Sequence, residues 1–144
     1  MDILKMADVP PSVVEVTATV LEAIELMVRK RVGAVAVVEQ DRLLGIFTER
    51  DVMVKVVPAR RDPSTTTMAE VMTSPVESAS VETTAGEALA LMIERHFRHL
   101  PIVDAQGRIL GMLSIRNLLE SRVDDLTREL DSLETYLTAD GPGG

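Results

Sequence analysis

The chain has 144 residues, about the length of one domain, and its 46% apolar content excludes a disordered protein, because disordered chains hold too few apolar residues to form a core. Aromatic residues make up only 2% and cysteine is absent, which argues against an aromatic platform for single-stranded nucleic acid and excludes disulfides, zinc–thiolate sites and thiol nucleophiles. The net charge is −8, and residues 118–144 hold 7 acidic but only 2 basic side chains, so nucleic acid, which binds through phosphate neutralisation, is not an expected partner.

The sequence shows no targeting or membrane signal. Residues 1–5 lack a basic segment followed by an apolar stretch, so no signal peptide is expected. The longest uncharged apolar run, around 33–38, is far shorter than the roughly 20 residues of a membrane helix. We expect a soluble, cytoplasmic protein without a membrane partner.

One pattern occurs twice along the chain, at residues 19–51 and 84–117. Each copy opens with Thr-x-x-Glu, a capping box that starts a helix, followed by apolar residues at helical spacing. Two apolar segments separated by a polar turn then predict a pair of strands, and a Thr or Ser marks the cap of a second helix. The predicted elements are helices over 20–28 and 85–93, and strands over 34–38, 43–47, 100–103 and 109–113. This order predicts an α/β (α+β) fold of small sheets covered by helices.

Composition divides the chain further. The stretch 58–67 is typical of a linker, and it leads into a short helix at 68–72 that Thr67 caps and Ser74-Pro75 ends. We therefore expect a first repeat at 1–57, the linker at 58–67, a second repeat at 68–121, an amphipathic helix at 122–138 and a disordered tail at 139–144.

The C-terminal region carries a heptad pattern. Its apolar residues alternate spacings of four and three, and they are Leu119, Val123, Leu126, Leu130, Leu133 and Leu137. Charged residues keep the other faces polar. Such a helix can lie on its own domain or pair with another helix, and the narrow seam favours self-association over intramolecular docking.

The segment Gly45-x-x-Thr48-x-x-Asp51 allows two interpretations. Thr48 and Asp51 suit a helix N-cap and the third helical residue, which requires no ligand. Alternatively, Gly45 lets the backbone approach a flat ligand, the helix N-terminus attracts an anion, and Asp51 accepts hydrogen bonds from a cis-diol. The second copy has Asn117 in place of the acid, which predicts a weaker hold on a diol, because charge-assisted hydrogen bonds are stronger.

The sequence contains no recognisable catalytic arrangement. Cysteine is absent, no Ser lies in a Gly-x-Ser-x-Gly motif, and the acids are scattered over helices and turns. His96 and His99 have no evident nucleophile to serve and no further His or Cys to complete a soft-metal site. We expect neither an enzyme nor a metal site.

Four stretches, 45–51, 71–75, 98–104 and 111–117, carry a resemblance to a known family. In their order, spacing and duplication they resemble a tandem pair of cystathionine-β-synthase (CBS) domains, a stand-alone Bateman module. The resemblance covers about residues 1–122. It implies two helix–strand–strand–helix repeats packed sheet to sheet about a pseudo-two-fold axis, two clefts between them, and a homodimer.

The resemblance also implies site residues for an adenosine-containing ligand. The ribose would lie at Thr48, Asp51, Ser114 and Asn117. Phosphates would lie near Arg98 and His99, with Arg31 and Arg50 as further candidates. The adenine slot would be formed by Val14, Val16, Val35, Ser78 and Leu100. We expect one good site, at Asp51, and a weaker or differently used site at Asn117.

The resulting functional hypothesis is a regulatory, energy-sensing module. It would bind AMP, ADP, ATP or S-adenosylmethionine, with magnesium as an optional companion and no resident cofactor, and would signal to a regulated protein that the sequence does not identify. The alternative is a ligand-free dimeric scaffold that acts through its C-terminal helix.

Overall fold

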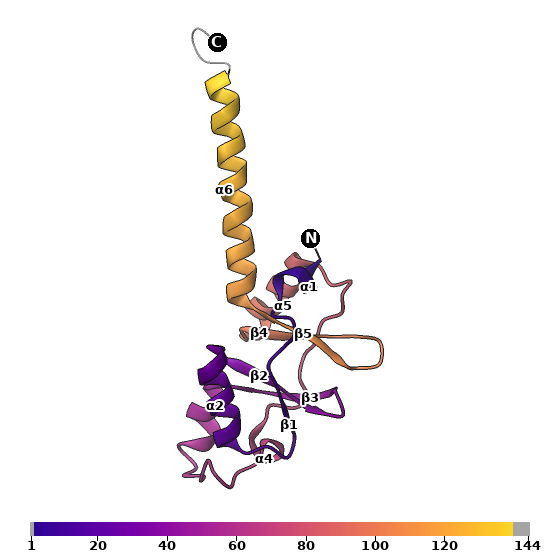
Figure 1. Ribbon diagram of the computed structural model, residues 1–144, viewed down its shortest axis with the longest axis vertical. Helices are drawn as coiled ribbons and strands as arrows, with labels where there is room; N and C mark the ends of the chain where they lie inside the picture. The colour runs from indigo at the N-terminus through magenta and orange to yellow at the C-terminus, as the bar shows by residue number, and fades with distance from the viewer. Residues whose placement is uncertain (1, 140–144) are drawn as a thin grey trace.

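The computed structural model describes residues 2–139 (Figure 1). Its helices are α1 (Ile3–Met6), α2 (Val20–Lys30), α3 (Glu49–Asp51), α4 (Met68–Val71), α5 (Ala85–Arg95) and α6 (Ile115–Ala139), and a π-helix, η1 (Val52–Val56), continues α3. Its strands are β1 (Val13–Glu15), β2 (Ala34–Glu39), β3 (Arg42–Thr48), β4 (His99–Val103) and β5 (Ile109–Ser114).

Local capping starts the long helices of both repeats. The Thr19 hydroxyl accepts a hydrogen bond from the Glu22 amide at 3.2 Å, and the Thr84 hydroxyl accepts one from the Glu87 amide at 3.1 Å. These bonds satisfy amide groups that have no partner inside the helix. The predicted helix–strand–strand–helix order is confirmed in both repeats.

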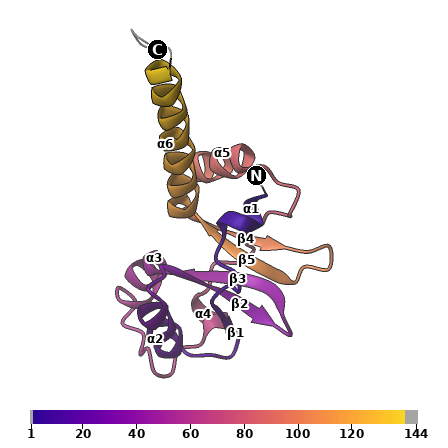
Figure 2. The same cartoon turned by 45° about the horizontal axis from the view of Figure 1, so that its top comes forward.

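Two small sheets face one another (Figure 2). The first has the order β1-β2-β3, with β1 parallel and β3 antiparallel to β2, and the second is the β4-β5 hairpin. Between them lies a buried cluster in which Ala34, Ala36 and Ile46 of the first repeat meet Met112 of the second. The predicted sheet-to-sheet packing is therefore confirmed, and burial of this apolar surface holds the repeats together.

The repeats exchange the segments that precede them. Ile3 of α1 belongs to the core of the second repeat, with Met92 and Leu113, whereas Met68 of α4 belongs to the core of the first repeat, with Phe47. We call residues 3–12 and 68–77 the leading segments. The predicted boundaries at 57 and 68 separate the repeats along the chain. In the folded protein, however, each core includes the leading helix of the other repeat.

A glycine lies where each leading segment crosses the other repeat. A Cβ on Gly45 would lie 2.7 Å from the backbone oxygen of Thr73, and one on Gly111 would lie 3.1 Å from Leu4 Cδ1. Backbone pairing fixes the crossings, since the Ile46 amide donates to the Thr73 oxygen at 3.1 Å and the Met112 amide donates to the Asp8 oxygen at 3.1 Å. Gly45 thus admits a protein backbone at the place where the sequence suggested a flat ligand.

The expected linker is attached to α2. The Val20 amide donates to the Thr66 oxygen at 2.8 Å and the Leu21 amide donates to the Pro63 oxygen at 2.9 Å. Thr66 is buried. The segment 58–67 therefore covers the N-terminal end of α2.

The C-terminal helix α6 begins at Ile115, inside the second repeat, and runs without a break to Ala139. The separate helix expected from 122 is its outer part, which projects away from both repeats (Figure 1). The tail expected at 139–144 lies outside the described residues except for Ala139, which ends α6. Of the helices between residues 2 and 139, none combines membrane-spanning length with sufficient hydropathy.

We predict that Gly45→Ala destabilises the protein by roughly 1–3 kcal/mol, the usual range for forcing an extra carbon into a packed site. The new methyl group would meet the Thr73 backbone, which cannot rotate away. Gly111→Ala should cost less, because its nearest neighbours, at 3.1 Å, are the side-chain ends of Leu4 and Val9 rather than backbone. The matched control is Gly86→Ala, whose methyl group meets no atom within 4 Å. Urea denaturation measures the free energy of unfolding of the three variants. Equal stability of the Gly45 and Gly86 variants would contradict the view that Gly45 is needed for the close approach of the leading segment.

Candidate functional site

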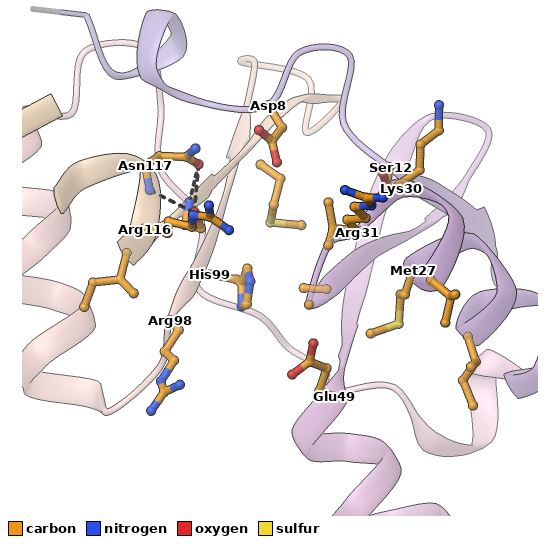
Figure 3. Close-up of a pocket in the computed structure, with 18 of the residues that line it drawn as sticks. Asp8, Ser12, Met27, Lys30, Arg31, Glu49, Arg98, His99, Arg116 and Asn117 are labelled. Carbon is orange, nitrogen blue, oxygen red and sulfur yellow. Dashed lines mark hydrogen bonds between the residues drawn. The ribbon is translucent and has the colours of Figure 1, made fainter. Parts of the chain in front are cut away.

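A cleft of about 1220 Å³ lies between the two repeats (Figure 3). One wall is formed by α2, the start of β2 and α3, and the other by the start of β4, the end of β5 and the first turn of α6. The first leading segment closes the space between the walls with Asp8, Pro10 and Ser12. Residues far apart in the chain therefore meet because the sheets stack.

The end of β5 and the start of α6 form the polar corner of the cleft. The Ser114 amide and hydroxyl both donate to Asn117 Oδ1 at 2.9 Å, and the Asn117 amide donates to Ser114 Oγ at 3.0 Å. This reciprocal cap satisfies one orphan amide of α6 and fixes both side chains. Ser114 and Asn117, both predicted to contact ribose, line the cleft.

Cations outnumber acids along the cleft. Its lining includes Lys30, Arg31, Arg98 and Arg116, against Asp8, Glu49 and Glu120. Arg116 Nε donates to Glu120 Oε1 at 2.9 Å, whereas Lys30, Arg31 and Arg98 form no ion pair within residues 2–139. Local positive charge in a protein of net charge −8 favours an anionic ligand here.

His99 lies at the centre of the cleft, half-buried at the start of β4 (Figure 3). Burial holds the pKa of its imidazole below the usual range, because the charged form loses hydration. Glu49 across the cleft acts in the opposite direction, and Arg98 adds to the lowering of this pKa. A neutral imidazole at this place can both donate and accept a hydrogen bond. Between residues 2 and 139, no three His, Cys, Asp or Glu side chains are grouped so as to hold a metal ion.

The apolar part of the cleft differs from the predicted adenine slot. Val35 and Leu100 are fully buried in the cores of their repeats, Val14 and Val16 pack against the first core, and Ser78 lines a separate cavity of about 240 Å³. The apolar side chains that do line the cleft include Ile24, Met27, Val28, Val52, Met112 and Ile115. Ile24, Met27 and Val28 are among the apolar residues whose helical spacing predicted the helix over 20–28, and no signal in the sequence indicated that they reach the cleft.

The Asp51 carboxylate, to which the sequence assigned the stronger site, is bonded to neighbouring groups of the protein. Asp51 Oδ2 accepts from the Thr48 amide at 3.0 Å, and Asp51 Oδ1 accepts from Thr73 Oγ1 at 3.0 Å. Lys55 Nζ lies 3.3 Å from Asp51 Oδ1. Thr48, Arg50 and Asp51 do not line the large cleft. The cap interpretation accounts for the Thr48–Asp51 bonds, and Thr73 and Lys55 add contacts from other elements. The assignment of a ligand to these residues remains a prediction.

The CBS domain model matches the chain twice, at residues 2–57 and 68–124. The CBS domain-containing protein YhcV of Bacillus subtilis is 34% identical over 107 residues, which are 74% of this chain and 75% of that protein. An uncharacterised protein of Methanopyrus kandleri is 33% identical over 105 residues, covering 72% of this chain and 54% of that protein. The chain spans only 15% and 20% of two longer relatives, from Schizosaccharomyces pombe and Arabidopsis thaliana.

Solved structures share this fold. A CBS-domain protein of Burkholderia ambifaria superposes with a TM-score of 0.77 at 37% identity, covering 85% of this chain and 92% of that chain. CBSX2 in complex with AMP gives 0.73 at 23% identity, covering 85% and 96%. The CBS domain pair of MJ0100, in complex with 5′-methylthioadenosine and S-adenosyl-L-methionine, gives 0.79 at 17% identity, covering 87% and 98%. At their identities the last two show a likeness of fold alone.

We predict a stability change on acidification that depends on His99. Its folded-state pKa is lowered, so below the unfolded value of about 6.5 the unfolded chain binds a proton that the folded chain does not. This contribution to stability is present above that pH and is lost as the pH falls through the folded pKa. Melting temperatures from about pH 7.5 to about pH 5.5 should therefore fall more for the wild type than for His99→Gln.

The control for this prediction is His96→Asn, which removes the exposed histidine at the end of α5. Asn is chosen because it tolerates the left-handed conformation (φ 59°) of this position. A pH profile of the His99 variant that matched the wild type would contradict the assignment.

Proposed function

Because the chain belongs to the CBS domain family and carries two CBS domains in tandem, we propose that it is a non-catalytic regulatory module that binds an adenosine-containing ligand between its repeats. The observation that carries this proposal is the cleft, which is lined by cationic side chains, a polar corner and an apolar wall. Related folds solved with AMP or S-adenosyl-L-methionine support the choice of ligand class.

The cleft offers each part of such a ligand a suitable surface. Phosphates would lie near Arg98, His99 and Arg116, at the positively polarised N-terminus of α6. The ribose would lie at Ser114 and Asn117, and the adenine would lie against the apolar wall that includes Met27 and Met112. The proposal thus moves the ligand from the Asp51 side, which the sequence favoured, to the Asn117 side.

A ligand in this cleft would contact both repeats and could therefore act on their relative orientation. It can shift that equilibrium only by binding one orientation more tightly than another. Ser114 and Asn117 belong to the cap and first turn of α6, so a change at the cleft would reach the projecting helix through continuous backbone hydrogen bonds. We propose this helix as the route to a regulated partner.

The seam of α6 is the proposed contact between two copies of the chain. Its six residues are exposed, and Leu130, for example, has 62% of its surface accessible. Two antiparallel copies would align every seam residue, with Leu119 opposite Leu137 of the partner and Leu126 opposite Leu130 of the partner. Such a face is self-complementary, as a two-fold interface requires. The scaffold alternative shares this contact and differs only in lacking the ligand.

We predict that adenosine nucleotides raise the melting temperature of the full chain. A ligand at about 100 times its dissociation constant stabilises the folded state by about 2.7 kcal/mol. Arg98→Gln should weaken binding of AMP, ADP or ATP about tenfold, because it removes one charge-assisted bond to phosphate. The matched control is Arg29→Gln, since Arg29 is exposed on α2 but does not line the cleft. Thermal denaturation measures the rise in melting temperature. Titration calorimetry, with and without magnesium, measures the affinities of the two variants. If no adenosine compound binds, the scaffold alternative is favoured.

We predict that the dimer depends on the seam. Truncation after Ser121 or the single change Leu130→Asp should lower the mass measured by sedimentation equilibrium. Ser132→Asp adds the same charge to an exposed position of α6 outside the seam and should leave the mass unchanged. Because Glu120, Glu129 and Glu134 flank the seam, association should strengthen as salt screens their repulsion. An unchanged mass after truncation would remove α6 from the dimer.

A further inference from the structure

The pseudo-two-fold arrangement makes Asp8 the counterpart of Thr73. The Asp8 amide donates to the Met112 oxygen at 2.9 Å and the Met112 amide donates back at 3.1 Å. The Thr73 amide donates to the Ile46 oxygen at 2.8 Å and the Ile46 amide donates back at 3.1 Å. Asp8 therefore has the same backbone relation to the Asn117 corner that Thr73 has to Asp51.

In the first repeat, the side chains at these positions meet directly. Thr73 Oγ1 donates to Asp51 Oδ1 at 3.0 Å. Lys55 Nζ lies 3.3 Å from the same oxygen and donates to Thr73 Oγ1 at 3.1 Å. The lysine ammonium thus occupies the point where the leading segment and the helix cap converge.

In the second repeat, the same point is open to the cleft. Ser121 stands four residues after Asn117, where Lys55 stands four after Asp51, and it is too short to take the place of a lysine. Asp8 and Asn117 both line the cleft (Figure 3). Within residues 2–139 the Asp8 carboxylate forms no ion pair and no hydrogen bond, and its charge acts on His99.

The chemistry of the two side chains is complementary to a vicinal diol. Asn117 Oδ1 is used in the cap by Ser114, so the atom left for the cleft is Nδ2, which can only donate. A diol also carries two O–H donors and needs an acceptor. The Asp8 carboxylate has two acceptor oxygens, and bonds to an ionised acceptor are the stronger kind.

We propose that Asp8, supplied by the exchanged leading segment, is the residue that selects a ligand with a ribose-type diol in this cleft. Asp8 accepts the hydroxyl protons while Asn117 Nδ2 donates to a hydroxyl oxygen. The carboxylate that the second cap lacks is thus provided by the leading segment of the first repeat. This inference rests on the proposed function and adds the group that distinguishes a ribose from a deoxygenated sugar.

The test compares AMP with 2′,3′-dideoxyadenosine monophosphate by titration calorimetry on the full chain. The wild type should bind AMP more tightly than the dideoxy compound. Asp8→Asn should weaken AMP binding about tenfold, the effect of one charge-assisted bond, and leave the dideoxy compound unchanged. Asp124→Asn, which removes an acid from the exposed face of α6, controls for the change in net charge and should alter neither affinity.

A second variant supplies a rescue. Asn117→Asp in the Asp8→Asn background should restore the preference for AMP. In the first repeat Asp51 caps with one oxygen and keeps the other for a partner from the leading segment, so the new carboxylate should cap with one oxygen and leave the other for the diol. Equal loss of both ligands in Asp8→Asn, or no loss of either, would overturn the role of Asp8 while leaving the proposed function standing. Failure of the wild type to bind either compound would overturn both.

Discussion

The reciprocal crossing of the leading segments is the constraint on which the rest of the structure depends. Each segment passes close to a strand in the other repeat: a Cβ at position 45 would overlap the Thr73 backbone oxygen, and one at position 111 would crowd the side chain of Leu4. The crossings place Ile3 in the second core and Met68 in the first. Neither repeat can complete its core alone, so the two sheets are held face to face and the cleft between them has a defined shape.

Small side-chain differences make two equivalent places unequal. On the Asp51 side, Lys55 bridges Asp51 and Thr73, and Arg95 pairs with Glu77 at 3.2 Å. The counterparts of that second pair, Lys30 and Ser12, line the open cleft, and within residues 2–139 Lys30 forms no ion pair. A duplicated fold thus supplies two similar backbones, and a few polar residues decide which of the two corners opens to the cleft. The exposed Arg95 pair contributes little alone, whereas the Lys55 bridge involves a buried carboxylate.

The sequence predicted what depends on local rules and missed what depends on distant partners. Helix caps at Thr19, Thr48 and Thr84, the strand pairs and the seam of α6 follow from spacing, because caps and periodicity involve residues within a few positions of each other. Motif matching put Asp51 first, since it carries the full pattern. The contact of Lys55 with Asp51 and Thr73 could not be anticipated, because it forms only when η1 and the second leading segment pack together. The exchange of α1 and α4 leaves no periodic signal, and neither does the cleft position of Met27.

The exchange of α1 and α4 between the two cores also constrains the order in which the cores can form during synthesis. Helix α1 is synthesised before the surface that receives it, which is formed by α5, β5 and α6. The first core needs nothing beyond α4 and closes early. Until the second repeat has emerged from the ribosome, Ile3, Leu4 and Met6 have no apolar surface to cover them and remain available for unintended association. Helix α1 can therefore reach its place in the second core only after β5 has been synthesised.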